Sequence, residues 1–486
     1  MEAGLPSAVL MERAALAVVE EMENHSYDLS RVCVAVGTGN NGGDGAAIAR
    51  LLAEKGFHPT IVCVGNPEKR SEMCRLQLQI AEHYAVERAE SIETGKYSLV
   101  VDSVFGIGLT REITGAFADC IEGINQAGCP VIAVDIPSGL QTDTGAVLGT
   151  AVQADLTVTF ARGKNGLYLG QGKRYAGEVI VREIGIPIRQ EILQAAEKQR
   201  LFAVDEEDLR CLPARDPLGN KGTFGKVLVV AGSETMFGAA YLCARAALLT
   251  GVGMVRVFTA AVNRAPLAAL LPETLITTYN AGCLKAETLE EAIAWADLVI
   301  AGPGMGTDRT AEDILQILLK KNSHPLVLDA DALNLMAKKP AYWEQLSVPC
   351  VITPHMGEMA RLTGSSIFGL KSDPLGAALD LAGRRDLICV LKDACTVIAA
   401  PDGLCFLNLS GDSSLSTAGS GDVLAGLIGG FLTQYGISPG IVADAVYLHG
   451  KCGEKAGEKL GKASVTAGDL LSEVPEILKD CAENIL

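Results

Sequence analysis

The sequence of 486 residues lacks an excess of positive charge. Its 41 lysine and arginine residues are outnumbered by 58 aspartate and glutamate residues, which gives a formal net charge of −17 and no run of five basic residues. Proteins that bind nucleic acid neutralise many phosphates and need a basic surface. The charge balance therefore argues against a nucleic-acid partner, although a small phosphate-bearing ligand needs no basic patch.

Paired cysteines and long apolar runs are also missing. The 14 cysteines lie between Cys33 and Cys481 with no C-x-x-C pair, and many stand in strand-like apolar runs, where cysteine acts as a small hydrophobic residue. Every apolar run is interrupted before about 18 residues, so we expect no membrane-spanning helix and no membrane partner. Without a recognisable secretory leader, we expect a cytoplasmic protein with reduced cysteines.

Hydrophobic residues and glycine are plentiful. Hydrophobic residues make up 49% of the sequence, which excludes a disordered chain, and the length suits two large α/β domains. In the first half, strands are expected at 31–37, 58–65, 97–103, 130–135, 155–160 and 178–185. Such continuously apolar runs are typical of parallel strands buried on both faces. We therefore predict a Rossmann-like, three-layer α/β domain with a doubly wound parallel sheet.

A polar, charge-rich segment separates this region from a second α/β region. Strands resume at 225–232, and the P-D-G turn at 401–403 predicts a hairpin between two apolar runs. We place the first domain at 1–190, a linker at 191–214 and the second domain at 215–486.

A turn rich in glycine and amide side chains, Asn40–Gly45, follows the first expected strand. Its G-x-G-x-x-G pattern alone is weak evidence for a dinucleotide site, and the acidic residue that should end the next strand is absent. The turn could serve only to cap a helix. The density of glycine, amide and carboxylate groups instead favours a ligand site at a helix N-terminus.

Polar residues also follow two later strands. Asp102 ends one strand, and Asp135 and Ser138 follow the next. Ligands bind outside the carboxyl ends of strands in open parallel sheets, so Asn41, Asp102 and Ser138 could converge there. Their oxygen atoms suit a hard, weakly bound cation better than zinc.

The motifs N-x-x-G-D-G, V-D-S-V-F-G-I-G and V-D-I-P-S-G-L, in this order, resemble the NAD(P)H-hydrate epimerase family over about residues 1–190. The resemblance implies interconversion of the R and S epimers of NADHX and NADPHX. It implies a potassium ion held by Asn41, Asp102 and Ser138, and a catalytic role for Asp135. The implied substrate-binding residues are Asn40, Asn41, Gly42, Gly43, Asp44, Gly106, Ile107, Gly108, Leu109, Thr110, Arg111, Glu112 and Asp135.

The strongest motif of the second region is a glycine-rich turn that opens an apolar helix with Asp422. Backbone N–H groups of such a turn bind phosphate oxygens, and Asp422 could accept a proton from an attacking hydroxyl. The alternative is an aspartate that only caps the helix. No Walker motif G-x-x-x-x-G-K-[ST] occurs.

Further charged groups stand at the ends of expected strands in this region. Lys392 could meet nucleotide phosphate or be a solvated charge, Asp329 and Asp331 end another strand, and His355 and Glu358 lie on a turn that enters a helix. Zinc is disfavoured because no second histidine or cysteine stands within helical reach of His355.

The set N-K-G-T-F-G-K, A-G-P-G-M-G, D-A-D-A-L-N, T-P-H-M-G-E, L-K-x-x-x-T and G-x-G-D-V-L-A-G resembles the ADP/ATP-dependent NAD(P)H-hydrate dehydratases of the ribokinase-like superfamily over about 215–486. The resemblance implies a ribokinase-like fold, Asp422 as catalytic base, magnesium, and ADP or ATP as co-substrate. The implied substrate-binding residues are Ala239, Gly304, His355, Met356, Gly357, Glu358, Met359, Ala360, Arg361 and Asp422. The implied nucleotide-binding residues are Lys392, Asp393, Ala394, Cys395, Thr396, Asp412, Ser413, Ser414, Leu415, Ser416, Thr417, Ala418, Gly419, Ser420 and Gly421.

Two residues depart from the second family's pattern. Asp393 stands where glycine is usual and adds negative charge beside the expected phosphate site, whereas Ser420 replaces threonine conservatively. Together the motifs predict a bifunctional repair enzyme for hydrated nicotinamide nucleotides, using ADP by preference and forming a homo-oligomer. The alternative is a ribokinase-like small-molecule kinase fused to a non-catalytic nucleotide-binding domain.

Overall fold

The computed structural model describes residues 5–186, 198, 200–280 and 282–483. The chain divides into two compact units. The first holds Met1–Gln194 and Lys371–Asp373, and the second holds Ala195–Leu370 and Pro374–Leu486. No helix of the described part is both long and apolar enough to cross a bilayer.

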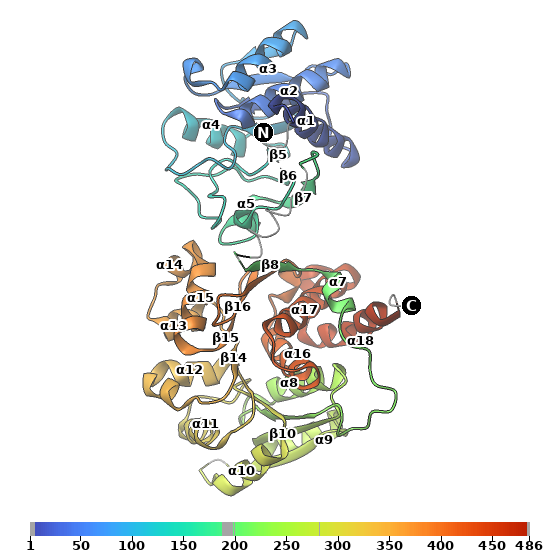
Figure 1. The fold of residues 1–486 in the computed structure, drawn as a ribbon, viewed down its shortest axis with the longest axis vertical. Coiled ribbons are helices and arrows are strands. Elements are labelled where there is room, and N and C mark those ends of the chain that lie inside the picture. Colours follow the sequence, from blue (N-terminus) through green and yellow to red (C-terminus); the bar gives the residue numbers. More distant parts are fainter. Residues whose placement is uncertain (1–4, 187–197, 199, 281, 484–486) are drawn as a thin grey trace. The chain divides into compact units, whose positions relative to one another are not determined.

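The first unit is built on a seven-stranded sheet in the order β3-β2-β1-β4-β5-β6-β7, and every neighbouring pair is parallel (Figure 1). Its strands are β1 (Val32–Val36), β2 (Thr60–Cys63), β3 (Glu87–Ala89), β4 (Leu99–Ser103), β5 (Val131–Val134), β6 (Leu156–Phe160) and β7 (Glu178–Arg182). Its helices are α1 (Ser7–Asn24), α2 (Asn40–Glu54), α3 (Glu72–His83), α4 (Ala116–Asn125) and α5 (Gly172–Tyr175).

Alternate residues of the central strand β1 enter two different cores. Val34 and Val36 pack with residues of α1, α2 and α3, whereas Cys33 and Ala35 pack on the other face with residues of α4. Both faces of the sheet are therefore covered at β1, which explains why this strand is apolar at every position. The predicted three-layer fold with a parallel sheet is confirmed.

The second unit is built on a ten-stranded sheet in the order β11-β10-β9-β12-β13-β14-β15-β16-β17-β8. Its strands are β8 (Leu201–Val204), β9 (Lys226–Val230), β10 (Met254–Ala260), β11 (Leu275–Tyr279), β12 (Leu298–Ala301), β13 (Leu326–Leu328), β14 (Cys350–Ile352), β15 (Ile388–Leu391), β16 (Thr396–Ala399) and β17 (Cys405–Asn408). All neighbouring pairs are parallel except β15–β16 and β16–β17, and the latter pair is the hairpin predicted on the P-D-G turn.

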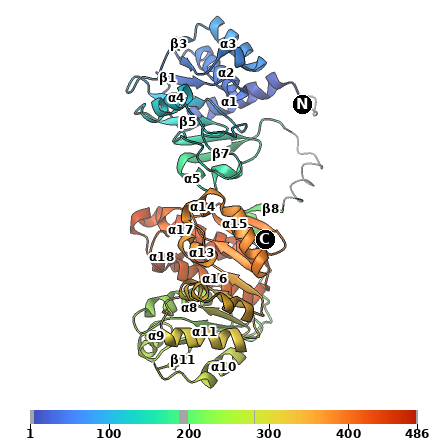
Figure 2. The ribbon, with the colours of Figure 1, turned by 90° about the vertical axis from the view of Figure 1, so that its left-hand side faces the viewer.

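Two groups of helices cover this sheet. Helices α8, α16, α17 and α18 pack on one face with Val227, Val229 and Ile300, and α8 and α16 lie side by side in both views (Figures 1 and 2). Helices α10 to α15 lie across the sheet from them (Figure 1). The helices are α7 (Glu206–Arg210), α8 (Phe237–Leu249), α9 (Arg264–Leu270), α10 (Ala286–Trp295), α11 (Arg309–Lys321), α12 (Ala330–Lys338), α13 (Met356–Thr363), α14 (Ile367–Ser372), α15 (Pro374–Arg385), α16 (Ser420–Tyr435), α17 (Pro439–Leu460) and α18 (Ala467–Glu483).

Part of the segment predicted as a linker, 191–214, forms secondary structure of the second unit. Residues 191–197 and 199 lie outside the described part, but β8 pairs with β17 at the edge of the second sheet. The Phe202 and Phe406 rings lie 5.9 Å apart, and Asp205 caps α7. Residues 201–210 therefore belong to the second sheet and its covering helices. Their mixed polarity concealed this because β8 is half exposed.

Candidate functional site

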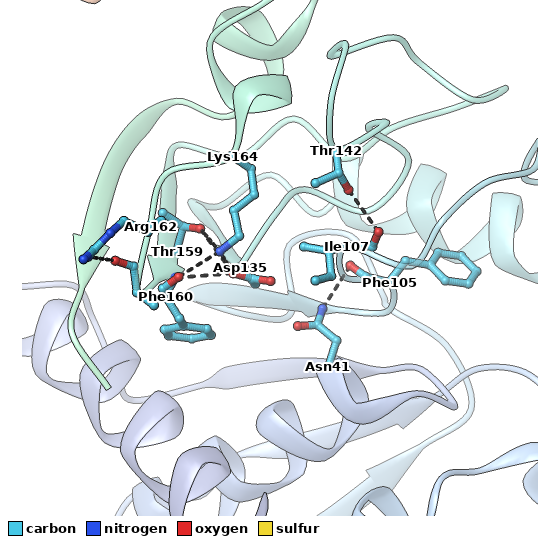
Figure 3. A network of polar contacts seen from close by, with 10 residues as sticks. Asn41, Phe105, Ile107, Asp135, Thr142, Thr159, Phe160, Arg162 and Lys164 are labelled. Carbon is cyan, nitrogen blue, oxygen red and sulfur yellow. Dashed lines mark hydrogen bonds and ion pairs between the residues drawn. The ribbon is translucent and has the colours of Figure 1, made fainter. Parts of the chain in front are cut away.

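The three residues predicted to bind potassium meet at the carboxyl end of the first sheet. The Ser138 backbone N–H donates to Oδ2 of Asp102 at 2.7 Å, and its hydroxyl donates to Oδ1 at 2.6 Å. The Phe105 N–H donates to the Ser138 hydroxyl at 2.8 Å, and Nδ2 of Asn41 donates to the Phe105 carbonyl at 3.0 Å (Figure 3). Strands β4 and β5 and the start of α2 thus bring these side chains together.

Asp102 is the only acidic residue of this group, and it is completely buried. Burial raises the pKa of its carboxyl to about 6, although hydrogen bonds from Ser138 and Val104 act in the opposite direction. Among the described residues, no cluster of three or more histidine, cysteine or acidic side chains could hold a metal ion. A single carboxylate surrounded by hydroxyl, amide and carbonyl oxygens suits a monovalent cation.

Asp135 occupies a backbone conformation that side-chain-bearing residues rarely adopt. It follows β5 with φ of 70°, which typically costs about 1–3 kcal/mol and persists where the surrounding structure fixes it, often at functional sites. Its Oδ1 accepts hydrogen bonds from the Thr159 hydroxyl at 3.2 Å and from the Phe160 N–H at 3.3 Å. The strained turn thus presents the carboxylate at the strand end predicted from the sequence.

Lys164 is a residue of this site that the sequence reasoning missed. Its Nζ donates to Oδ1 of Asp135, to the Thr159 hydroxyl at 2.8 Å and to the Phe160 carbonyl at 3.0 Å (Figure 3). The side chains of Lys164 and Asp135 are each only 15% exposed, so solvent weakly screens this ion pair. The sequence signal that could have identified Lys164 is its position soon after the end of the strand β6.

A second carboxyl group, that of Asp44, lies within electrostatic range of this pair. Burial, and next the negative charge of Asp135, raise the pKa of Asp44 well above its usual range. A buried carboxyl group beside a second carboxylate is an arrangement that can support acid–base chemistry.

The other predicted epimerase residues lie in two backbone turns. Residues 40–44 form the first turn of α2, and a Cβ on Gly42 would lie 2.3 Å from the Gly37 carbonyl oxygen, so only glycine fits there. Residues 106–112 form the loop after β4, which the Thr142 hydroxyl ties down through the Ile107 carbonyl at 3.1 Å (Figure 3). Leu109 is 6% exposed and packs in the core, so only its backbone could reach a ligand.

The predicted base of the second domain, Asp422, stands in the first turn of α16, directly after a left-handed glycine turn at Gly419. Burial raises the pKa of Asp422 to about 7, with further contributions from the charges of Asp329 and Asp331, while Lys392 acts in the opposite direction. A carboxyl group with a pKa near neutrality is matched to general-base work at physiological pH.

Lys392 lies against the same turn. Its Nζ donates to Oδ1 of Asp329 at 2.9 Å, and the Thr353 hydroxyl donates to the same oxygen at 2.6 Å. A Cβ on Gly421 would lie 3.4 Å from Nζ. Burial would lower the pKa of Lys392, but the negative charges of Asp329 and its acidic neighbours outweigh burial and raise it. A permanent positive charge therefore stands beside the glycine turn.

His355 has a local structural role that the sequence did not reveal. It is the N-cap of α13: its Nδ1 accepts from the Gly357 N–H at 2.9 Å, and Glu358 accepts from the His355 N–H at 2.9 Å. The Lys392 N–H donates to the Pro354 carbonyl at 2.8 Å, so this turn lies next to β15. In the same predicted substrate segment, Met356 and Met359 are buried, whereas Arg361 is exposed.

Two other predicted substrate residues of this domain are in contact. A Cβ on Gly304, in the turn after β12, would lie 2.8 Å from the Cβ of Ala239 in α8. The structure thus joins the start of α8 to the turn that follows β12.

The predicted nucleotide loop, 412–421, packs closely on helix α17. A Cβ on Gly450 would lie 2.0 Å from the Ser410 hydroxyl, and a Cβ on Gly457 would lie 2.4 Å from the Ser414 hydroxyl. Larger residues at either position would push the loop away. The two glycines are visible in the sequence, but the sequence does not show that they approach Ser410 and Ser414.

Charged residues near α17 fix the start of the same loop. Glu454 accepts from the Gly411 N–H at 2.7 Å, and Nζ of Lys462, which follows α17, lies 2.8 Å from a carboxylate oxygen of Asp412. Sequence reasoning missed both residues because they lie more than 40 positions away in the chain.

Ser420 begins α16, where the resembled family has threonine. Its hydroxyl donates to the Leu415 carbonyl at 2.8 Å, a bond that threonine could make as well. Nε2 of His449 lies 2.9 Å from the Ser420 carbonyl, and burial lowers the pKa of this histidine to about 4. A neutral histidine on α17 thus holds the start of α16.

These sites, each at the carboxyl ends of parallel strands, define a two-domain α/β enzyme. Residues 7–166 match the family described as YjeF-related protein N-terminus, and residues 227–476 match NAD(P)H-hydrate dehydratase. The chain is 38% identical to the bifunctional NAD(P)H-hydrate repair enzyme Nnr of Moorella thermoacetica, covering 99% of this chain and 94% of that protein. It is 33% identical to the Escherichia coli enzyme of the same name, covering 98% and 90% of the two chains. The chain belongs to the bifunctional NAD(P)H-hydrate repair enzyme family.

Solved structures agree for the second domain. A ribokinase-like superfamily protein from Enterococcus faecalis is 28% identical with a TM-score of 0.53, covering 59% of this chain and 98% of that one. The ADP/ATP-dependent NAD(P)H-hydrate dehydratase from Bacillus subtilis, co-crystallised with ATP and Mg²⁺, is 31% identical with a TM-score of 0.51, covering 58% and 98%. The family and the ribokinase-like fold predicted from the sequence are confirmed.

Proposed function

We propose that the first domain interconverts the R and S epimers of NADHX and NADPHX, and that the second dehydrates the S epimer with ADP in preference to ATP. The observation that carries the proposal is Asp422, whose pKa is raised to about 7 beside Lys392 and a glycine turn at a helix N-terminus. We assign epimerisation to 1–190 and dehydration to the region from β8 onward.

The chemistry of dehydration explains why a nucleotide is consumed. Hydroxide is a poor leaving group, so the ring hydroxyl must first be converted into a better one. Asp422 takes the hydroxyl proton while the oxygen attacks the terminal phosphoryl group, and the bond from that phosphorus to the shortened nucleotide breaks. The ring carbon then releases phosphate, a neighbouring carbon loses a proton, and the ring double bond returns.

Backbone and side-chain groups stabilise the transferring phosphoryl group in this scheme. The N–H groups at the start of α16 face phosphate oxygens, and Lys392 supplies positive charge. Carboxylate oxygens of Asp329 and Asp331, with nucleotide phosphates and water, fit the oxygen ligands that Mg²⁺ prefers. When bound, Mg²⁺ would neutralise charge on the nucleotide phosphates.

Epimerisation needs an acid and a base on opposite faces of the ring. Asp44, with its raised pKa, donates a proton to the departing hydroxyl, which leaves as water when the C–O bond breaks. Asp135, which is paired with Lys164, takes a proton from the water that adds to the other face. One water leaves and one returns, and the proton gained by Asp135 passes back to Asp44 through solvent, so the reaction consumes nothing.

A potassium ion at Asp102 predicts a stability effect that can be measured without substrate. Exchanging choline chloride for potassium chloride should raise the melting temperature of the wild-type first domain by about 2–4 °C when potassium is near ten times its dissociation constant. Since the pKa of Asp102 is about 6, the effect should fade below that pH as the carboxylate is protonated.

The matched variant for this prediction is Asp102→Asn, which removes the charge and also disturbs the hydrogen bond from the Ser138 N–H. For each protein, the melting temperature in potassium chloride is compared with that in choline chloride, so the stability lost with this hydrogen bond does not affect the comparison. A wild-type protein indifferent to potassium at pH 8 would remove the proposed ion.

The proposed reactions are tested by incubating the protein with chemically hydrated NADH and ADP while recording the absorbance of the reduced ring. Complete recovery requires both domains, because the hydrate is a mixture of epimers. No recovery with either ADP or ATP would refute the proposal. A kinase that releases its phosphorylated product would consume nucleotide without restoring absorbance.

We also propose that the chain acts as a cytoplasmic homo-oligomer. Exposed Leu270, at the end of α9, and Leu275, in the edge strand β11, support a homo-oligomer, since exposed apolar groups often mark subunit contacts. Light scattering coupled to size exclusion measures the assembly directly, and a monomer across the working concentration range would contradict it.

A further inference from the structure

An open cavity of about 490 Å³ lies on the second unit. It is lined by Thr307, Asp331, Asn334, Ala337, Lys338 and Arg361. Asp331 connects the cavity to the predicted catalytic turn, because it follows Asp329 by two residues, and Asp329 accepts from Lys392 beside Gly421. The volume is within the range of small-molecule sites.

A chain of hydrogen bonds fixes one wall of this cavity. The Gly306 N–H donates to Asp331 at 2.8 Å, Nδ2 of Asn334 donates to Asp331 at 3.3 Å, and Nε of Arg361 donates to Oδ1 of Asn334 at 3.0 Å. Only Nε of the guanidinium group is engaged, and no carboxylate of the described residues forms an ion pair with Arg361. Its terminal nitrogens therefore remain available to an acceptor in the cavity.

Lys338 adds a second positive charge to the same cavity. It is the last residue of α12 and is exposed, and within the described part of the chain it forms no ion pair. Its neighbour Lys339 behaves differently, since it pairs with Glu312. In a chain of net charge −17, two cations without ion pairs to described residues outnumber the one carboxylate of this cavity, that of Asp331, and so favour an anionic ligand.

Arg361 is already among the substrate-binding residues implied by the family resemblance, whereas Lys338 is not. We propose that Lys338, together with Arg361, binds a phosphate group of the hydrated dinucleotide in this cavity, at a distance from the reacting ring. The inference rests on the proposed dehydration. Every such substrate carries a pyrophosphate, and NADPHX carries one phosphate more. Arginine meets phosphate oxygens with a planar pair of N–H donors, whereas lysine supplies a point charge. Binding there would hold the substrate while Asp422 acts on the ring.

The test compares Lys338→Gln with the matched control Lys339→Gln, using the S epimers of NADHX and NADPHX and saturating ADP. We expect the first variant to raise KM about tenfold with kcat unchanged, as for the loss of one charge-assisted contact, and the control to leave KM unchanged. An increase for both substrates identifies the pyrophosphate as the ligand, whereas an increase for NADPHX alone identifies its additional phosphate.

Two outcomes would overturn the inference. The first is an unchanged KM in Lys338→Gln for both substrates; if the melting temperature also falls, Lys338 only stabilises the end of α12. The second is an equal increase of KM in Lys339→Gln. Failure of the proposed function is distinguishable, because the wild-type protein would then convert neither substrate.

Discussion

Replacing Asp422 with asparagine is expected to lower kcat for dehydration by about 10²–10⁴-fold while leaving epimerisation intact. Asparagine retains the shape of the side chain but cannot accept the proton of the attacking hydroxyl. The measurement is recovery of reduced-ring absorbance from the pure S epimer, with the rate of R-to-S conversion followed separately by chromatography.

The same assignment predicts a pH profile. The pKa of Asp422 is raised to about 7, and only the ionised carboxylate is a base, so kcat/KM for dehydration should rise with pH and level off above that value. Asp469→Asn, which changes a partly exposed carboxylate at the start of α18, serves as a control and should retain the wild-type profile. Substantial dehydration by Asp422→Asn would refute the role of Asp422 as base.

Replacing Asp135 with asparagine should have the converse effect. Epimerisation is expected to fall by about 10²–10⁴-fold, because no carboxylate remains to take the proton from water, while dehydration of the pure S epimer stays at the wild-type rate. With the mixed hydrate, recovery of absorbance should then stop once the S fraction is consumed, apart from slow uncatalysed conversion of the rest.

Lys164→Met tests whether the ion pair between Lys164 and Asp135 takes part in epimerisation. Removing the ammonium group leaves the carboxylate of Asp135, which is only 15% exposed, without its cation, so epimerisation should slow while dehydration of the S epimer stays unchanged. Arg162→Met, which changes an exposed neighbour paired with Glu183, is the control. If Lys164→Met epimerises at the wild-type rate, the ion pair has no part in the reaction.

The sequence predicted the central strands because they are buried on both faces. Strands such as β1 and β5 are apolar at every position, so their type and parallel packing could be predicted from composition alone. The edge strands β3, β8 and β11 are half exposed. Their sequences did not indicate which strand each would pair with, since these partners lie far away in the chain.

In the candidate sites, too, some residues could be predicted from the sequence and others could not. The meeting of Asn41, Asp102 and Ser138 could be predicted, because parallel strands end at one edge of a sheet. The roles of Lys164 and Glu454 could not, since a single charged residue is usually solvated and only tertiary contacts show its partner. The left-handed conformation of Asp135 is likewise imposed by its surroundings and not by residue type.

The glycines of α17 have a consequence for the loop predicted to bind the nucleotide. Gly450 and Gly457 let this loop lie directly on the helix, and Glu454 and Lys462 hold its start. A loop that contacts within the chain hold in place loses little conformational entropy when a ligand binds. We therefore expect any difference in affinity between ADP and ATP to come from contacts with the nucleotide and not from folding of the loop.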